Sequence, residues 1–189
     1  GGGGLIAGMA TYIKHYAPEV KVIGVEPEDS PTLYQALKNG ERVILPEVGR
    51  FADGVAVKQI GEKTYPIAKK VVDEVVLVSN DEICAAIKDI YEDVRSIAEP
   101  AGALATAGLK KYIEKNAIEN EHLVAVISGA NVNFDRLRYI SERADLGEHN
   151  EAIIAATIDE KPGSFLKFCE LLDNHSITEF NYRYTPSNQ

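Results

Sequence analysis

The chain has 189 residues, of which 45% are hydrophobic and 26% are charged, a composition typical of a soluble globular protein. Its formal net charge of −9 argues against a nucleic-acid partner, because proteins that bind nucleic acid usually carry a basic face. No apolar run is long enough to span a membrane, so we expect no membrane partner and a cytoplasmic location. The two cysteines, Cys84 and Cys169, stand far apart and indicate neither a disulfide framework nor a zinc site.

Four consecutive glycines, Gly1 to Gly4, run directly into a stretch of small and apolar residues that predicts a helix from Leu5 to about Tyr16. Backbone N–H groups without side chains around them can converge on one phosphate, and the helix dipole favours an anion there. The alternative is a flexible linker, but a linker needs no helix joined to its last residue. Because no strand precedes the loop, we expect the sequence to begin in the middle of a protein.

Short apolar runs then alternate with amphipathic stretches along the chain. Ser30 and Pro31 predict the start of a short helix that stops at Asn39, and Ser79 with Glu82 has the spacing of a capping box. A turn or short strand is expected around Gly54. The expected strands cover residues 20–25, 74–78 and 123–127, and the other expected helices cover residues 64–70, 83–94, 101–115 and 133–144.

This alternation predicts an α/β fold, in which a parallel twisted sheet carries helices on both faces. Ligands of such sheets bind at the carboxyl ends of the strands. Two polar turns, Glu26-Pro27 and Ser128–Asn131, directly follow expected strands. We therefore expect both turns to lie near a ligand.

The pattern changes near residue 147. A strand is expected over residues 153–158, a helix around the apolar stripe from Phe165 to Leu172, and a half-buried strand over residues 178–184. Two strands and one helix do not make a stable sheet layer alone. We therefore expect one domain over residues 1–147 and the start of a truncated α+β domain over residues 148–189.

A dinucleotide-binding module is one interpretation of the first domain. Gly2, Gly4 and Ala7 satisfy the spacing of a dinucleotide fingerprint, and Glu26 follows at the end of the next strand, as a ribose-binding acid would. The fingerprint, however, gives no role to the remaining glycines or to the turn at Ser128–Asn131.

Five motifs occur in order: the glycine loop with Leu5, Gly24–Pro27, Ala52–Ala56, Glu99–Ala103 and Ser128–Asn131. In this set the chain resembles the pyridoxal-phosphate enzymes of the tryptophan-synthase-β type, and among them the serine and threonine dehydratase branch. Residues 161–169 and 177–184 resemble the opening of the ACT-like regulatory domain of biosynthetic threonine dehydratases, also called threonine ammonia-lyases or threonine deaminases. The resemblance covers essentially the whole chain and implies an incomplete large domain of pyridoxal-phosphate fold type II.

The resemblance implies pyridoxal 5′-phosphate as the cofactor. The glycine loop would hold the 5′-phosphate, Gly54 would lie beside the cofactor ring, and Ser128 would hydrogen-bond the pyridine nitrogen. The implied cofactor-binding residues are Gly1, Gly2, Gly3, Gly4, Leu5, Gly54 and Ser128. The Schiff-base lysine of this family precedes the glycine loop, so no catalytic residue is expected in this chain, and the chain alone is expected to be inactive.

The implied activity is the conversion of L-threonine to 2-oxobutanoate and ammonia in isoleucine biosynthesis. Isoleucine and valine are the implied effectors, and a homo-oligomer, a tetramer, is the implied assembly. Serine dehydratase or racemase chemistry on the same fold is the nearest alternative, and a non-catalytic amino-acid-sensing module is another.

The resemblance also points to a place where relatives hold a cation with an acid, a backbone carbonyl and a second acid. In this chain the three places are Glu26, Ser30 and Thr32. Hard cations need sufficient ligand charge, and Thr32 is not an acid. We therefore expect no metal beyond a weak cation site at Glu26 and Ser30.

Overall fold

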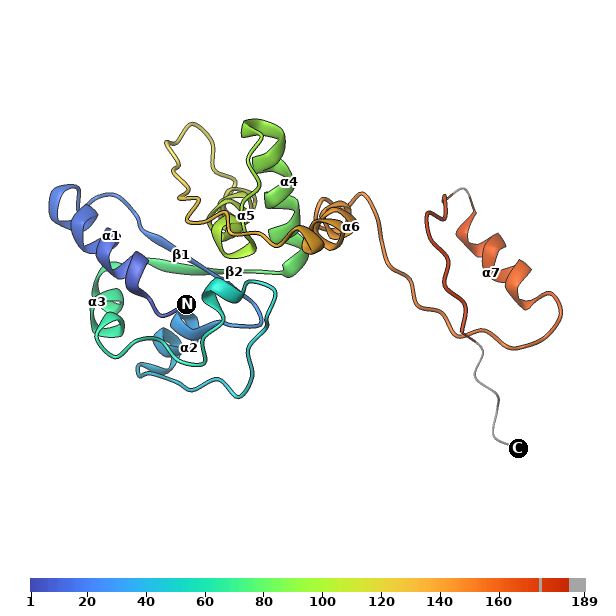
Figure 1. The fold of residues 1–189 in the computed structure, drawn as a ribbon, viewed down its shortest axis with the longest axis horizontal. Coiled ribbons are helices and arrows are strands. Elements are labelled where there is room, and N and C mark those ends of the chain that lie inside the picture. The colour runs from blue at the N-terminus through green and yellow to red at the C-terminus, as the bar shows by residue number, and fades with distance from the viewer. Residues whose placement is uncertain (174, 184–189) are drawn as a thin grey trace. The chain divides into compact units, whose positions relative to one another are not determined.

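The structure, a computed structural model, describes residues 1–173 and 175–183 (Figure 1). The chain divides into two compact units, Gly1–Ala152 and Ile153–Gln189. The first unit contains α1 (Gly4–Tyr16), β1 (Ile23–Pro27), α2 (Thr32–Asn39), the 3₁₀ turn η1 (Asp53–Val55), α3 (Thr64–Val71), β2 (Glu74–Val78), α4 (Asn80–Val94), α5 (Pro100–Asn116), the 3₁₀ turn η2 (Phe134–Arg136) and α6 (Leu137–Gly147). The second unit contains α7 (Ser164–Leu172).

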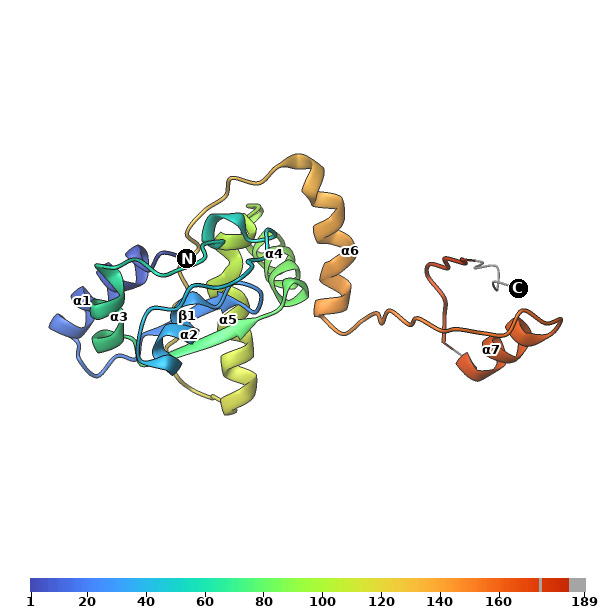
Figure 2. The same ribbon diagram turned by 90° about the horizontal axis from the view of Figure 1, so that it is seen from below.

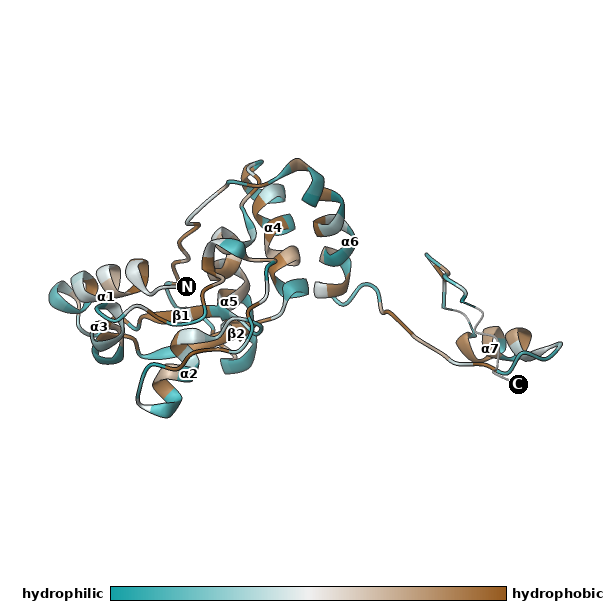
Figure 3. Ribbon diagram, turned by 60° about the horizontal axis from the view of Figure 1, so that its bottom comes forward, coloured by the Kyte–Doolittle hydropathy of each residue, from teal (hydrophilic) through white to brown (hydrophobic). Residues whose placement is uncertain are grey.

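Strands β1 and β2 form a parallel pair in which Ile23 lies opposite Glu74 and Pro27 lies opposite Val78. Figure 3 shows that both strands are largely apolar. This composition is typical of parallel strands that are covered on both faces. Val76 and Val78 pack into a core with α4 and α5, whereas Val75 packs against the cluster formed by α2 and α3. The expected parallel sheet with helices on both faces is thus confirmed.

The starts of α2 and α4 show how well capping could be predicted. The capping box of α4 is confirmed, because the Ser79 hydroxyl accepts from the Glu82 N–H and the Glu82 carboxylate accepts from the Ser79 N–H. The expected Ser30 cap of α2 is wrong, since Pro31 is the N-cap and makes no side-chain bond. The carboxylate of Glu26, at the end of β1, instead accepts hydrogen bonds from the first turn of α2.

Three expected strands are not formed among the described residues. Residues 123–127 and 153–158 have no ladder, and neither do residues 178–183, while Tyr184 lies outside the described part of the chain. A strand is held by a hydrogen-bonded neighbour, and these segments find none there. Side chains that the pattern predicts to be buried are therefore exposed, as Val124 (87%) and Ile153 (75%) illustrate.

The second unit, taken by itself, is built around α7. The ring of Phe165 lies 6.4 Å from that of Phe168 and 5.0 Å from that of Phe180, so the helix packs against the chain that follows it. Phe165 thus has a partner within its own unit, although no residue of α7 is buried. In the part of the chain that the structure describes, no helix is long and apolar enough to cross a membrane.

Candidate functional site

The glycine loop is bound to the protein at the carbonyl group of Gly2, where the Thr64 hydroxyl donates at 2.5 Å. The Thr32 hydroxyl lies 3.2 Å from the Gly1 carbonyl oxygen, but its one hydrogen is donated to the nearer Glu26 carboxylate, at 2.9 Å. The Gly61 N–H also donates to the Gly2 oxygen, at 3.1 Å. In a trans peptide the C=O and the following N–H point in opposite directions. The N–H groups of Gly2 and Gly3 therefore point away from the threonines.

The loop leads into α1 without a side-chain cap. Gly3 is the N-cap, with φ at 83°, a backbone conformation that favours glycine. A Cβ added at Gly2 or at Gly4 would meet nothing within 4 Å, so the loop is open on that side. The first N–H groups of a helix have no partner inside it, and the helix dipole adds positive potential there. The loop therefore has the chemistry of an anion site.

The turn at η1 lies between this loop and the start of α5. A Cβ added at Gly1 would lie 3.3 Å from the Cα of Val55. On the other side, a Cβ added at Gly54 would lie 3.0 Å from the Cβ of Ala101 and 3.6 Å from a carboxylate oxygen of Glu99. The structure thus brings Gly1, Gly54 and the Glu99 motif together, although they are far apart in the sequence.

Glu99 joins the turn at Ser128–Asn131 to this group. Its N–H donates to the Gly129 carbonyl at 3.1 Å, and its carboxylate accepts from the Asn131 N–H, also at 3.1 Å. Glu99 is the N-cap of α5, but its side chain does not cap that helix. The carboxylate is instead used to hold the turn.

Gly102 allows α5 to approach the same turn closely. A Cβ at Gly102 would lie 2.2 Å from the carbonyl oxygen of Gly129 and 2.8 Å from its nitrogen, which no L side chain tolerates. Ser128 is exposed, next to this fixed backbone. Glu99 thus binds the turn by hydrogen bonds, and Gly102 lets α5 pack directly against its backbone, while the Ser128 side chain remains accessible.

Glu26 serves the structure of α2. Its side chain is 4% exposed, and it accepts hydrogen bonds from the Thr32 hydroxyl and from the N–H groups of Leu33 and Tyr34, each at 2.9 Å. A carboxylate bound to three donors is not free for ribose hydroxyls, so the dinucleotide interpretation loses its acid. The weak cation site at Glu26 and Ser30 stays a prediction. The described residues contain no group of three or more His, Cys, Asp or Glu side chains that could hold a metal ion.

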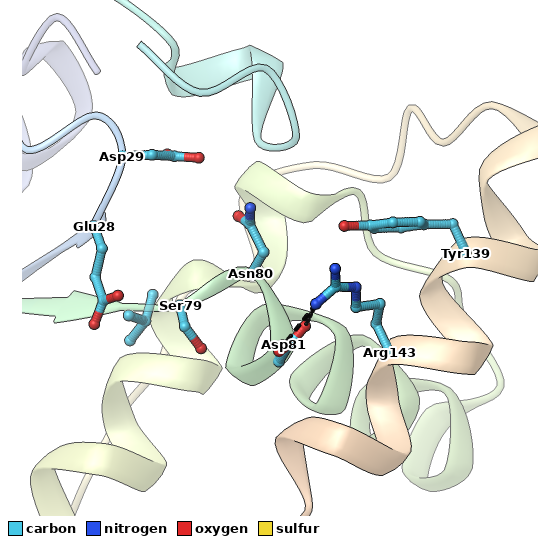
Figure 4. A pocket seen from close by; sticks show the side chains of 8 residues that line it. Glu28, Asp29, Ser79, Asn80, Asp81, Tyr139 and Arg143 are labelled. Atoms are coloured by element: carbon cyan, nitrogen blue, oxygen red, sulfur yellow. Dashed lines mark hydrogen bonds and ion pairs between the residues drawn. The ribbon is translucent and has the colours of Figure 1, made fainter. Parts of the chain in front are cut away.

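A hollow lies at the carboxyl ends of β1 and β2 (Figure 4). It has a volume of about 280 Å³ and is lined by Glu28, Asp29, Val78, Ser79, Asn80, Asp81, Tyr139 and Arg143. Arg143 Nη1 lies 2.9 and 3.2 Å from the two carboxylate oxygens of Asp81, and these hydrogen bonds raise the pKa of the guanidinium. The one arginine of this hollow is thus already paired with an acid.

Residues 1–129 match the family of pyridoxal-phosphate dependent enzymes, and residues 142–189 match the C-terminal regulatory domain of threonine dehydratase. The first match covers more than half of the chain, and the chain belongs to the family of pyridoxal-phosphate dependent enzymes.

Within this family the chain is similar to particular dehydratases. It is 59% identical to the biosynthetic L-threonine dehydratase IlvA of Pasteurella multocida, over 100% of this chain and 37% of that protein. It is 57% identical to the Escherichia coli protein of the same name, over 97% of this chain and 36% of that protein. The solved structure of processed threonine deaminase isoform 2 from Solanum lycopersicum aligns with a TM-score of 0.76 at 49% identity, over 77% of this chain and 40% of that one. The chain thus spans little more than a third of the length of its curated relatives.

The residues present fit the cofactor of this family. The glycine loop offers backbone N–H groups at an uncapped helix start, which suits a phosphate. The turn at Gly54 lies between that loop and the turn carrying Ser128, so phosphate-binding and ring-binding groups are brought into one region.

The sequence did not reveal Thr64 as the residue that orients the loop, nor the use of Glu99 to hold a distant turn. The only signal for Thr64 was a hydroxyl residue at the start of a predicted helix.

Proposed function

We propose that the chain is part of a pyridoxal-phosphate-dependent threonine dehydratase, which converts L-threonine to 2-oxobutanoate and ammonia. One observation carries this proposal: the glycine loop, the Gly54 turn and the Ser128–Asn131 turn converge, joined by Val55 and Glu99. The 59% identity to a biosynthetic L-threonine dehydratase and the match of residues 142–189 to the regulatory domain of threonine dehydratase support it.

The proposal assigns a task to each part of the site. Pyridoxal phosphate, when bound, supplies an electron sink for the bonds at the substrate α-carbon. The backbone of Gly1 to Gly4 and Leu5 binds the phosphate, and Gly54 leaves room beside the ring. Ser128 hydrogen-bonds the ring nitrogen. Because a neutral hydroxyl stabilises a protonated ring less than a carboxylate does, Ser128 favours prompt loss of the substrate hydroxyl.

The nucleophilic lysine is proposed to lie outside these 189 residues. Lys14 is bound to the Val20 carbonyl at 2.8 Å and to Asp73 at 2.7 Å, and Lys58 is bound to the Pro46 carbonyl at 2.9 Å. These lysines are used in the structure of the first unit. Because the Schiff-base lysine of this family precedes the glycine loop, the chain alone is expected to be inactive.

We further propose a catalytic domain over residues 1–147 and the start of an ACT-like regulatory domain over residues 148–189. The packing of α6, which ends at Gly147, on α4 supports a boundary after this helix, whereas the first compact unit extends to Ala152 and the match to the regulatory domain begins at residue 142. Isoleucine and valine are the proposed effectors, since the reaction would supply isoleucine biosynthesis. The proposed assembly is a homo-oligomer, a tetramer, and the proposed location is the cytoplasm.

The test uses the full-length enzyme, meaning the longer protein that contains this chain. Purified enzyme with pyridoxal phosphate should form 2-oxobutanoate from L-threonine, and truncation after Gly147 should leave turnover but abolish inhibition by isoleucine. Pyridoxal phosphate should raise the melting temperature, whereas NAD should not. Stabilisation by NAD alone would replace this proposal with the dinucleotide interpretation, and turnover of L-serine in clear preference to L-threonine would reassign the substrate.

A further inference from the structure

The helix α6 and the turn η2 before it contact the segment that leads into Gly54. Arg136 Nη1 donates a hydrogen bond to the Phe51 carbonyl oxygen at 2.9 Å and lies 3.7 Å from Oδ1 of Asp53. One turn further along α6, the Tyr139 ring lies 5.4 Å from the Phe51 ring, at an interplanar angle of 54°. The segment just before Gly54 is therefore bound at its backbone by the Arg136 guanidinium, and its Phe51 ring packs against the ring of Tyr139.

Arg136 also follows the other turn of the site closely in the sequence. The chain leaves Asn131, whose N–H is held by Glu99, and reaches η2 within a few residues. Arg136 thus connects the backbone after Ser128 with the backbone before Gly54. These are the two turns that flank the proposed cofactor ring; Arg136 binds the one before Gly54 and follows the other along the chain.

Helix α6, whose N-cap is Arg136, is firmly packed in the first unit. Ile140 and Ala144 of α6 are 5% and 0% exposed and belong to the core that includes α4 and α5. Arg143 binds Asp81, and Lys88 of α4 lies 3.2 Å from Asp145 and 2.8 Å from Glu148. Figure 2 shows α6 alongside α4. A helix fixed by both a core and ion pairs can determine where Arg136 places its guanidinium.

We propose that Arg136 is a positioning residue for the cofactor site, which fixes the Gly54 turn relative to the Ser128 turn. This inference rests on the proposed function. In this proposal Arg136 acts through the backbone it binds, not through contact with the cofactor or the substrate. It sets the space between two backbone segments, and a planar guanidinium suits this task because it can bind the Phe51 carbonyl and face Asp53 with the same group.

The test compares Arg136→Met with Arg50→Met in the full-length enzyme. Arg50 is exposed and directly precedes Phe51, so both variants remove one positive charge beside the same turn. In cofactor-free protein, Arg136→Met should speed amide hydrogen exchange in the peptide covering residues 51–56. With pyridoxal phosphate bound, the visible circular dichroism band of the cofactor should weaken. The kcat for threonine should fall about 10- to 100-fold while KM changes by less than about twofold, since misplacement costs rate rather than substrate contacts.

Arg136→Lys keeps the charge and one donor, and it should recover at least about a third of the wild-type kcat and the cofactor band. If Arg136→Met does not fold, Arg136→Gln takes its place with the same expectations. A variant with wild-type exchange and an unchanged cofactor band would overturn the inference, and so would equal effects in Arg50→Met. Failure of the wild-type enzyme to bind pyridoxal phosphate would instead contradict the proposed function, and the exchange measurement would still report whether Arg136 holds the turn.

Discussion

The carboxylate of Glu99 accepts a hydrogen bond at 3.1 Å from the N–H of Asn131, 32 residues further along the chain. The N–H of Glu99 donates to the carbonyl of Gly129, so a single residue binds the turn after Ser128 through both its backbone and its side chain. The start of α5 is thereby built into the candidate cofactor site.

Replacing Glu99 should loosen this turn. We expect Glu99→Ala to lower the free energy of unfolding by about 1–2 kcal/mol, the usual cost of losing a charged acceptor at a partly buried site. The affinity for pyridoxal phosphate should fall about tenfold, which corresponds to about 1.4 kcal/mol. Urea unfolding and cofactor titration of the full-length enzyme would measure both. Glu92→Ala, at an exposed position of α4, is the matched control and should change neither quantity.

Adding one methyl group to α5 should be severely disruptive at Gly102 and harmless in α1 at Gly8. A Cβ at Gly102 would collide with the backbone of Gly129, which cannot rotate away as a side chain can. We expect Gly102→Ala to destabilise the protein by about 2–4 kcal/mol and to abolish cofactor binding. Gly8 is also helical, but a Cβ there meets nothing within 4 Å. Gly8→Ala should stabilise the protein by up to about 1 kcal/mol, and thermal unfolding that ranked the two variants equally would contradict this geometry.

Thr64, which binds the glycine loop, should control phosphate affinity. Thr64→Val removes the hydroxyl that binds the Gly2 carbonyl while keeping the branched shape of the side chain. The loop then loses one of the bonds that orient its N–H groups, and the dissociation constant for pyridoxal phosphate should rise about 5- to 10-fold, or about 1 kcal/mol. Thr64→Ser should retain most of the affinity. Thr11→Val, which loses only a bond to the Ala7 carbonyl inside α1, should leave cofactor affinity unchanged in the same titration.

Cys84 should remain protonated well into the alkaline range. Burial, together with the nearby charge of Asp81, raises the pKa of its thiol to about 12. A group whose pKa is raised on folding contributes stability that is present below its unfolded value, near 9, and is lost as the pH rises toward the folded value. The free energy of unfolding should therefore fall between pH 9 and pH 12 by up to about 1.4 kcal/mol per pH unit from this residue. That slope should be smaller in Cys84→Ala.

The same residue gives an independent chemical test. In the native protein at pH 8, iodoacetamide should modify Cys169, which is partly exposed, and leave Cys84 unmodified. Denaturant should make both cysteines reactive. Rapid native modification of Cys84 would show that the helix carrying it opens more readily than its burial implies.

Apolar patterns correctly predicted α1, α3 and β2, and the spacing of Ser79 and Glu82 correctly predicted the capping box of α4, because each depends on residues close in the sequence. Prediction failed where distant residues decide. Residues 123–127 have the pattern of a buried strand, but a ladder needs a neighbour that the described residues do not provide. Glu26 looked like a ligand-binding acid, whereas its nearest donors are the N–H groups of α2.

In the candidate site, too, features of consecutive residues could be predicted and contacts between distant residues could not. The glycine loop and the turn at Ser128 were recognisable as motifs, since their chemistry lies in consecutive residues. The groups that hold them in place were not, because Thr64 approaches Gly2 from 62 residues away and Arg136 approaches Phe51 from 85 residues away. Hydrophobic patterns contain little information about single hydrogen bonds across such separations.

The long separation between the glycine loop and its threonines also constrains when the loop can take shape during folding. Gly1 and Thr32 are 31 residues apart, and Gly2 and Thr64 are 62 residues apart. Contacts between distant residues form late, because closing a long loop costs entropy before any contact compensates for it. The glycines can present their N–H groups in a fixed order only after β1, α2 and α3 have assembled. Capture of a phosphate by this loop should therefore follow the assembly of β1, α2 and α3.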